Sequence, residues 1–155
     1  RNNGQQCLAG SRILVQRSIS KRFIEAFVER ARRIRIGDPL QADTELGPLA
    51  FRQHMERLLS FAEVARNDGA KLLTGGKRST AQPRGWVIEP TAVLAADNDA
   101  RVCREEIFGP FATFLEFDTL DELKALSFLP DAVAIAIHAK FHPDAGHQAT
   151  GSSSS

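Results

Sequence analysis

Apolar residues return every three or four positions in two long segments of the chain, and this spacing predicts two amphipathic helices. The first is expected to begin at a Ser18 cap and to run to about Ile34, before the helix-ending turn at residues 37–39. The second is expected over residues 51–67, with Gly69 as its stop signal. The expected buried positions are Phe23, Ala26, Phe27, Ala31 and Ile34 in the first helix, and Met55, Leu58, Leu59, Ala62 and Ala65 in the second.

Short apolar runs predict strands between and after these helices. The runs cover residues 11–15, 70–74, 86–94 (interrupted at Pro90), 111–117 and 132–139, and a further short helix is expected over residues 120–128. The last run is apolar on both faces, which is typical of a strand inside a sheet that helices cover on each side. Strands that alternate with helices in this way predict an α/β fold, with a mostly parallel sheet flanked by helices.

The composition is that of one ordinary globular domain, which we expect over residues 1–148, with a disordered Ser-rich tail over residues 149–155. With 20 basic and 19 acidic residues, the chain lacks the surplus charge that would indicate a nucleic-acid partner. No apolar run approaches the roughly 20 residues of a membrane span. Two cysteines are too few for a disulfide scaffold, so a reducing, cytoplasmic location is expected. The polar start without Met indicates that the chain begins inside a longer polypeptide.

Two segments carry residues that could do chemistry. In the first, Gly4 and Gly10 flank Cys7, so that tight turns could bring backbone N–H groups toward the sulfur or toward a developing oxyanion. In the second, Glu105 and Glu106 precede Phe108, and a carboxylate can accept hydrogen bonds from ribose hydroxyls while an aromatic ring borders a nicotinamide. Taken alone, the first segment also fits a packed thiol and the second a solvated turn.

The other candidates are weaker. We expect Cys103 to be a packed thiol and residues 44–49 to form a structural turn before the second helix. His138, His142 and His147 are close in sequence but do not share a helical face, so no metal site is expected.

Taken together and in order, these segments resemble the aldehyde dehydrogenase superfamily. The family motif around its nucleophile is Asn-x-Gly-Gln-x-Cys followed by Ala-Gly-Ser-Arg, and residues 2–12 match it with Cys7 in the cysteine position. Further family landmarks are Gly-Asp-Pro at residues 37–39, Leu-Gly-Pro-Leu at 46–49, an aromatic-x-x-Glu-Pro-Thr at 86–91 and Glu-Glu-Ile-Phe-Gly-Pro at 105–110. The resemblance runs from Asn2 to about Lys140 and implies the family's catalytic-domain fold, truncated at both ends.

The resemblance implies NAD(P)-dependent oxidation of an aldehyde to a carboxylic acid. Cys7 would attack the aldehyde carbon to give a thiohemiacetal, hydride would leave to NAD or NADP, and water would release the resulting thioester. The backbone N–H of Cys7 would hold part of the oxyanion. Glu106 would bind the nicotinamide ribose, with Phe108 beside the nicotinamide, and Glu105 would have a structural part only. The intact parent would be a homo-oligomer.

Departures from the family pattern leave alternatives open. The family's general-base glutamate, its oxyanion-hole asparagine and its cofactor-binding domain all lie upstream of the cysteine, so we expect this chain alone to be inactive as a dehydrogenase. Residues 127–133 keep the Pro of the family's Asn-Asp-x-Pro-Tyr-Gly-Leu but lose its Tyr-Gly. A non-catalytic remnant that keeps the fold, or a cofactor-independent thiol esterase acting through Cys7, would be consistent with these departures.

Overall fold

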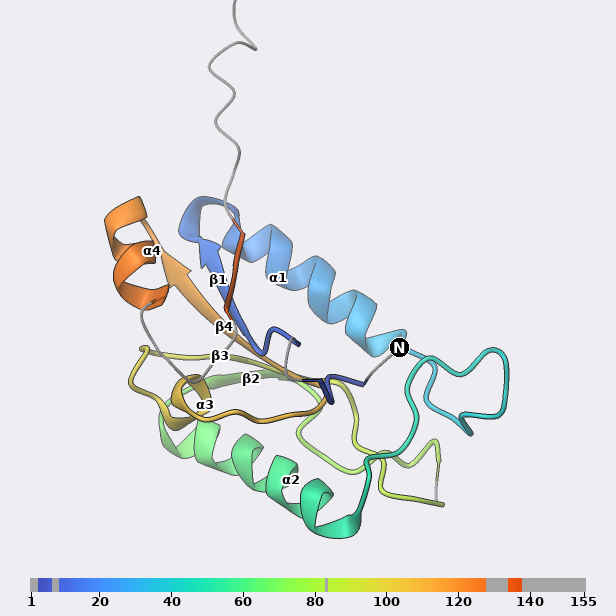
Figure 1. The fold of residues 1–155 in the computed structure, drawn as a ribbon. Coiled ribbons are helices and arrows are strands. Elements are labelled where there is room, and N and C mark those ends of the chain that lie inside the picture. The colour runs from blue at the N-terminus through green and yellow to red at the C-terminus, as the bar shows by residue number, and fades with distance from the viewer. Residues whose placement is uncertain (1–2, 7–8, 83, 128–133, 138–155) are drawn as a thin grey trace, which may run out of the picture.

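The computed structural model describes residues 3–6, 9–82, 84–127 and 134–137, so Cys7, the 149–155 tail and parts of the 132–139 segment lie outside the described residues. The described part is one five-stranded sheet with helices on both faces (Figure 1). In chain order its elements are β1 (Arg12–Gln16), α1 (Arg17–Arg32), α2 (Arg52–Asn67), β2 (Lys71–Thr74), β3 (Thr91–Leu94), α3 (Arg101–Arg104), β4 (Phe111–Phe117), α4 (Leu120–Ser127) and β5 (Ala134–Ile137).

The sheet has the strand order β2-β3-β4-β1-β5. Three of its four pairings are parallel, and only β2 and β3 run antiparallel. The central pair is β1 and β4, which lie about 100 residues apart in the sequence and align Arg12 with Thr113 and Gln16 with Phe117. The predicted α/β fold with a mostly parallel sheet is confirmed.

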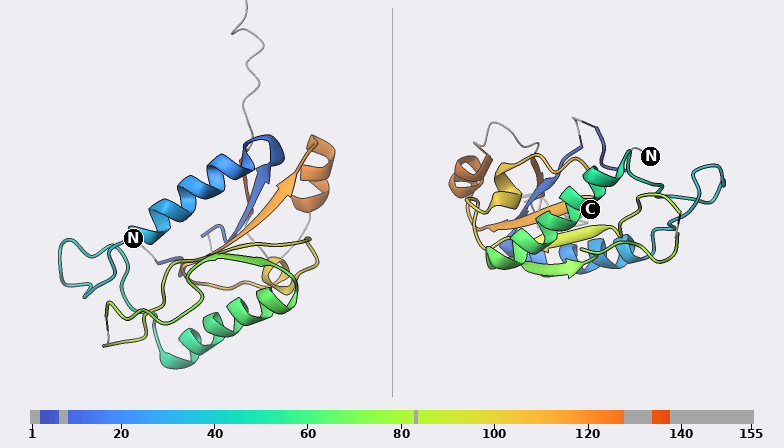
Figure 2. Two further views of the ribbon diagram at one scale, coloured as in Figure 1. Left: turned by 180° about the vertical axis from the view of Figure 1, so that it is seen from behind. Right: turned by 90° about the horizontal axis from the view of Figure 1, so that it is seen from below.

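Side chains of successive strand residues point to opposite faces, and each face has its own apolar core. In β1, Ile13 and Val15 pack with α1, while Leu14 belongs to the core under α2. In β4, Phe114 packs with α1, where the ring of Phe27 meets it edge-on at 5.0 Å between centroids. Figure 2 shows α1 alone on one side of the sheet and α2 on the other. None of the described helices is both long enough and apolar enough to cross a membrane.

The first helix differs from its prediction in two respects. It begins at Arg17, directly after β1, with Gln16 in the cap position and no side-chain capping bond, so the predicted Ser18 cap is wrong. Its buried residues are Ser20, Ile24, Val28 and Ala31. Ala26 is exposed, because the buried stripe is turned toward Ile24 and Val28. The larger rings of Phe23 and Phe27 still reach the core from the edge of that stripe.

The second helix is confirmed to within one residue of its predicted start, and Gly69, with φ of 79°, follows its end as predicted. Met55, Leu58, Ala62 and Ala65 are buried as expected, and Leu59 packs against the core while only partly buried. The buried stripe also includes Phe61 and His54, which were not among the predicted buried positions.

Two of the predicted strands differ from their predictions within the described residues. In residues 86–94 only Thr91–Leu94 joins the sheet, because Pro90 has no N–H to donate, and Ile88 forms an isolated bridge with Arg78. The prediction of a strand buried on both faces is wrong for Ile135 and Ala136, which point to opposite faces and are both exposed. Within the described residues β5 pairs with β1 alone, and Ile135 is 45% exposed.

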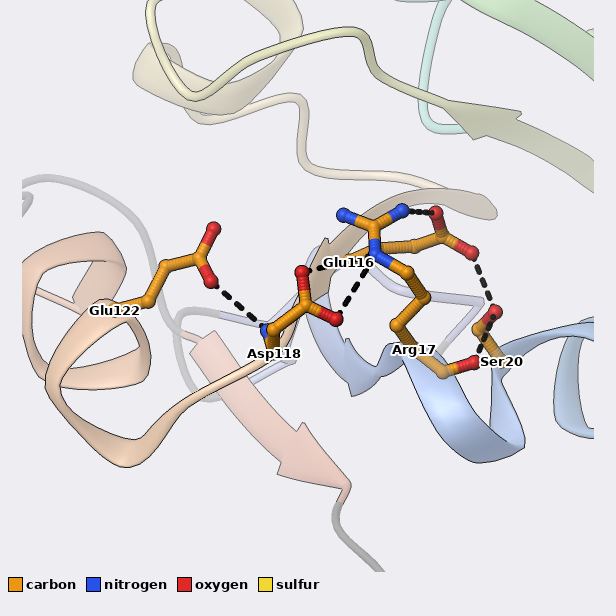
Figure 3. A network of polar contacts seen from close by, with 5 residues as sticks. All are labelled: Arg17, Ser20, Glu116, Asp118 and Glu122. Atoms are coloured by element: carbon orange, nitrogen blue, oxygen red, sulfur yellow. Dashed lines mark hydrogen bonds and ion pairs between the residues drawn. The ribbon is translucent and has the colours of Figure 1, made fainter.

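At the carboxyl edge of the sheet, an ion-pair network joins β4, α1 and α4 (Figure 3). Arg17 donates to both oxygens of Asp118 at 3.0 Å, and its Nη1 donates to Glu116. The hydroxyl of Ser20 donates to the other oxygen of Glu116. The carboxylate of Glu122 accepts a hydrogen bond from the backbone N–H of Asp118 at 2.8 Å, which ties the start of α4 to the end of β4.

Arg12, at the amino end of β1, is the largest fully buried side chain described. Its Nη1 donates to Asn98 Oδ1 at 3.0 Å, and its Nε and Nη2 have no hydrogen-bond partner among the described residues. Burial lowers the pKa of the Arg12 guanidinium. Among the described residues, Asn98 is therefore the acceptor that offsets part of the free-energy cost of burying this cation.

We predict that Asn98→Ala lowers the free energy of unfolding by about 2 kcal/mol, because it removes that acceptor from a buried guanidinium. Asn98→Asp, the matched control, keeps the acceptor oxygen and adds an opposite charge, but it loses the bond that the Asn98 amide donates to the Leu126 carbonyl oxygen at 3.4 Å, so it should be clearly more stable than the Ala variant. Urea unfolding followed by circular dichroism measures both variants. An Ala variant as stable as the original would contradict this role for Asn98.

Candidate active site

The segment with Glu106 and Phe108 connects α3 to β4 and is shaped by one buried side chain. Ile107 is 0% exposed and sits in the core under α2, so its two neighbours are turned away from that core. The carboxylate of Glu106 is exposed and has no hydrogen-bond or ion-pair partner among the described residues. Phe108 is half-buried with a φ of 59°, in the left-handed region that non-glycine residues rarely adopt.

Helix α2 holds the backbone of this segment from one side. Arg57 Nη2 donates to the carbonyl oxygen of Glu106 at 3.0 Å, and His54 Nε2 lies 2.7 Å from the carbonyl oxygen of Phe108. Leu58, on the same face of the helix, packs so closely on Gly109 that a Cβ there would lie 2.1 Å from Leu58 Cδ2. Sequence reasoning missed His54, although its position next to Met55 on the buried stripe of α2 was a usable signal.

The turn before β1 contacts the turn before β4. Asn3 and Gly4 both have positive φ, and a Cβ on Gly4 would lie only 2.1 Å from the carbonyl oxygen of Gly109. This contact brings the segment on which Cys7 lies against the end of the Glu-Glu-Ile-Phe-Gly-Pro segment, across more than 100 residues of sequence. Both turns precede strands that run parallel, so they share the amino edge of the sheet.

A cavity of about 570 Å³ adjoins the same edge. Its lining includes Asn3 together with residues from the 35–48 loop, among them Pro39, Gly47 and Pro48. The Gly-Asp-Pro and Leu-Gly-Pro-Leu segments that stood out in the sequence therefore gather beside the turn that leads to Cys7. The loop is closed by Gly37, whose N–H donates to the carbonyl oxygen of Leu46 at 3.1 Å.

The thiol of Cys103, in α3, is buried in the same core as Ile107. It is 1% exposed, and its Sγ donates to the carbonyl oxygen of Asp97 at 3.5 Å. Burial raises the pKa of Cys103 to about 12, and the nearby charge of Arg12 offsets only part of that rise. The prediction that Cys103 is a packed thiol is confirmed, because an uncharged, enclosed sulfur is a poor nucleophile.

A second cavity, of about 430 Å³, lies at the opposite, carboxyl edge of the sheet. Arg17, Glu116 and Glu122 line it, and each of them is engaged in the network of Figure 3. Among the described residues no three His, Cys, Asp or Glu side chains are grouped so that they could hold a metal ion. The exposed, unengaged carboxylate of Glu106 and the landmark segments therefore favour the amino edge as the functional one.

The profile of the Aldehyde dehydrogenase family matches residues 1–127. The chain belongs to the aldehyde dehydrogenase family. The betaine aldehyde dehydrogenase of Brucella anthropi is 42% identical over 126 residues, and the hydroxyisobutyraldehyde dehydrogenase of Mycolicibacterium austroafricanum is 37% identical over 122 residues. These matches cover 80% and 79% of this chain, but 26% and 24% of the relatives.

Solved aldehyde dehydrogenases have the same fold over the matched region. The betaine aldehyde dehydrogenase of Staphylococcus aureus in complex with NAD+ superposes with a TM-score of 0.79 at 39% identity, covering 81% of this chain and 25% of that one. The NAD+ complex of the aldehyde dehydrogenase from Bacillus cereus gives 0.77 at 33% identity, with the same coverage. The chain thus spans about a quarter of the length of these family members.

We predict that Gly4→Ala separates the two turns of this aldehyde dehydrogenase segment. A methyl group there meets the backbone of Gly109, which cannot move out of the way as a flexible side chain could. Hydrogen–deuterium exchange should therefore become faster in residues 3–10 and 105–110. Gly69→Ala is the control, because Gly69 has a similar φ of 79° but open space around it. Unchanged exchange at 105–110 in Gly4→Ala would contradict the contact.

We also predict an alkaline loss of stability that depends on Cys103. Below about pH 9 the thiol is neutral in both the folded and the unfolded chain, so its contribution is complete. Above that pH the unfolded thiol ionises while the folded one, with its pKa raised to about 12, stays neutral. The stability advantage over Cys103→Ala should then shrink by up to about 1.4 kcal/mol per pH unit. Urea unfolding of both proteins across this range measures it, and a constant difference would refute the prediction.

Proposed function

We propose that this chain supplies the nucleophile and the nicotinamide-riboside contacts of an NAD(P)-dependent aldehyde dehydrogenase that oxidises an aldehyde to a carboxylic acid. In this proposal Cys7 is the nucleophile, Glu106 binds the ribose and Phe108 borders the nicotinamide. The observation that carries it is the contact of the Asn3-Gly4 turn with Gly109, because it brings the segment on which Cys7 lies and residues 105–110, here called the cofactor segment, to one edge of the sheet.

The side chains of Glu106 and Phe108 are of the kinds that a nicotinamide riboside requires. Glu106 offers a carboxylate that no described residue engages, and two ribose hydroxyls are donors that such a group can accept from. Phe108, two residues further on, adds a half-buried aromatic ring. NAD(P), when bound, supplies the hydride acceptor of the reaction. The relatives from S. aureus and B. cereus were solved as NAD+ complexes, which supports NAD as the cofactor.

In the proposed reaction, the residues of this chain carry out the nucleophilic attack on the aldehyde and stabilise the negative charge that the attack creates. A Cys7 thiolate would add to the aldehyde carbon, and the negative charge that develops on the aldehyde oxygen would rest partly on the backbone N–H of Cys7. Loss of hydride would leave a thioester on Cys7, and its hydrolysis would return the thiol and release the acid. We place this thiol chemistry in a reducing, cytoplasmic compartment.

We predict that iodoacetamide at limiting concentration labels Cys7 at least a hundredfold faster than Cys103. At about pH 8, a thiol whose pKa is about 12 is ionised to only about one part in ten thousand, and Cys103 is enclosed as well. Mass-spectrometric peptide mapping measures both rates. In urea the two cysteines should react alike, which controls for sequence effects. Equal or inverted labelling of the folded chain would overturn the assignment of Cys7.

The catalytic proposal is tested in a hybrid enzyme. Residues 1–127 of this chain replace the matching segment of the B. anthropi betaine aldehyde dehydrogenase, which supplies the remaining three quarters of the protein. With betaine aldehyde and NAD+, the hybrid should form NADH, Cys7→Ala should reduce kcat by about a thousandfold or more, and Cys103→Ala should not. Glu106→Gln should raise KM for NAD+.

Other outcomes of the hybrid experiment point to other functions. NADH formation that survives Cys7→Ala would refute the nucleophile. A hybrid that folds and binds NAD+ but forms no NADH would favour a non-catalytic remnant. Hydrolysis of an activated ester that needs Cys7 but not NAD+, in the absence of any dehydrogenase activity, would favour a thiol esterase.

A further inference from the structure

His54 is a buried polar side chain with a specific partner in the cofactor segment. It lies in the first turn of α2 and is 9% exposed, and its ring contacts those of Phe51 and Phe108 at 5.7 and 6.2 Å between centroids. Its Nε2 is 2.7 Å from the carbonyl oxygen of Phe108. Because a carbonyl oxygen only accepts, Nε2 must carry the proton and donate it.

The residue that receives this bond has an unfavourable backbone conformation. At a φ of 59°, the Cβ of Phe108 crowds its own carbonyl oxygen, which is why this region is left mainly to glycine. Such a conformation persists only where the surroundings fix it. The residues on both sides of Phe108 are already fixed, Ile107 by its burial and Gly109 by its contact with Leu58. The carbonyl group of Phe108 is therefore the part of this backbone that still needs a partner to fix it.

We propose that His54 is a positioning residue, whose bond to the Phe108 carbonyl holds Phe108 in its left-handed conformation and so sets where the Phe108 ring and the Glu106 carboxylate stand. The part of this proposal that concerns cofactor positioning rests on the proposed function. The bond between His54 and Phe108 does not depend on the proposed function. Arg57, one turn further along α2, holds the neighbouring carbonyl of Glu106 and serves as the matched comparison.

Three variants of the full chain separate this role from general stability. His54→Phe keeps an aromatic ring in contact with Phe51 and Phe108 but has no donor. His54→Gln returns a donor of similar reach without the ring. Arg57→Met removes the bond to the neighbouring carbonyl and leaves the bond to Phe108. Hydrogen–deuterium exchange with mass spectrometry follows residues 104–111, and residues 91–95 of β3 report in the same sample whether the sheet is intact.

We expect His54→Phe to exchange about fivefold faster or more in residues 104–111, as loss of one buried hydrogen bond implies, with residues 91–95 unchanged. His54→Gln should restore most of the protection, and Arg57→Met should leave the Phe111 amide, which donates to the Gly109 carbonyl at 2.7 Å, as protected as in the original chain. Exchange in His54→Phe within twofold of the original chain would overturn the proposal.

If His54→Phe does not fold, the imidazole of the original chain decides the question. Nitrogen-15 spectra of histidine-labelled protein, with the His54 signal assigned by its loss in His54→Gln, identify the protonated ring nitrogen. A proton on Nε2 in a slowly exchanging signal supports the bond. A neutral ring protonated at Nδ1 alone overturns it, because no donor would then face Phe108.

The same exchange experiment on the hybrid enzyme of the proposed function, which supplies the cofactor-binding domain, is repeated with millimolar NAD+ and separates this inference from the proposed function. Protection of residues 104–111 by NAD+ in the hybrid, reduced at least threefold when the hybrid carries His54→Phe and regained with His54→Gln, supports both. Faster exchange in His54→Phe without any effect of NAD+ on residues 104–111 of the hybrid supports the bond and counts against the cofactor role. Equal protection of both proteins, with equal exchange, supports the cofactor role and overturns the positioning role.

Discussion

The parallel pairing of β1 with β4 is the constraint on which the arrangement of the site depends. These strands are far apart in the sequence, yet residues 12–16 align with residues 113–117 at the centre of the sheet. Because the two strands run in the same direction, the segments that lead into them must meet at one edge. The short contact between Gly4 and Gly109 is the result, and it requires glycine on the Gly4 side because any Cβ there would enter the opposing backbone.

The segment over residues 105–110 takes its shape from helix α2 as much as from the sheet. Ile107 fills the core beneath it. Three residues on one face of the helix, His54, Arg57 and Leu58, contact the backbone of the residues on either side of Ile107. Glu106 and Phe108 are thus displayed by a support of buried apolar contacts and two backbone hydrogen bonds. A site on such a support is better fixed than its position in a connecting segment would suggest.

The two edges of the sheet differ in how their charges are used. At the carboxyl edge, where open α/β sheets commonly bind ligands, Arg17 is paired with Glu116 and Asp118 (Figure 3). At the amino edge, the carboxylate of Glu106 has no partner among the described residues. An exposed carboxylate without a partner is free to receive a ligand, which is why the proposed function places the chemistry at this less usual edge.

The sequence by itself determined the elements whose periodicity is long and regular. Helix α2, strand β4 and the sheet's mostly parallel character followed from apolar spacing, and the family followed from motifs in a fixed order. Only the tertiary structure decided that Ser18 caps nothing, since β1 runs directly into α1, and that Pro90 confines β3 to Thr91–Leu94. It alone decided the partners of His54 and Arg12, because such contacts join residues 54 and 86 positions apart and leave no periodic trace in the chain. Local spacing encodes which face of an element is apolar, whereas the choice of what that face meets depends on how the whole sheet is assembled.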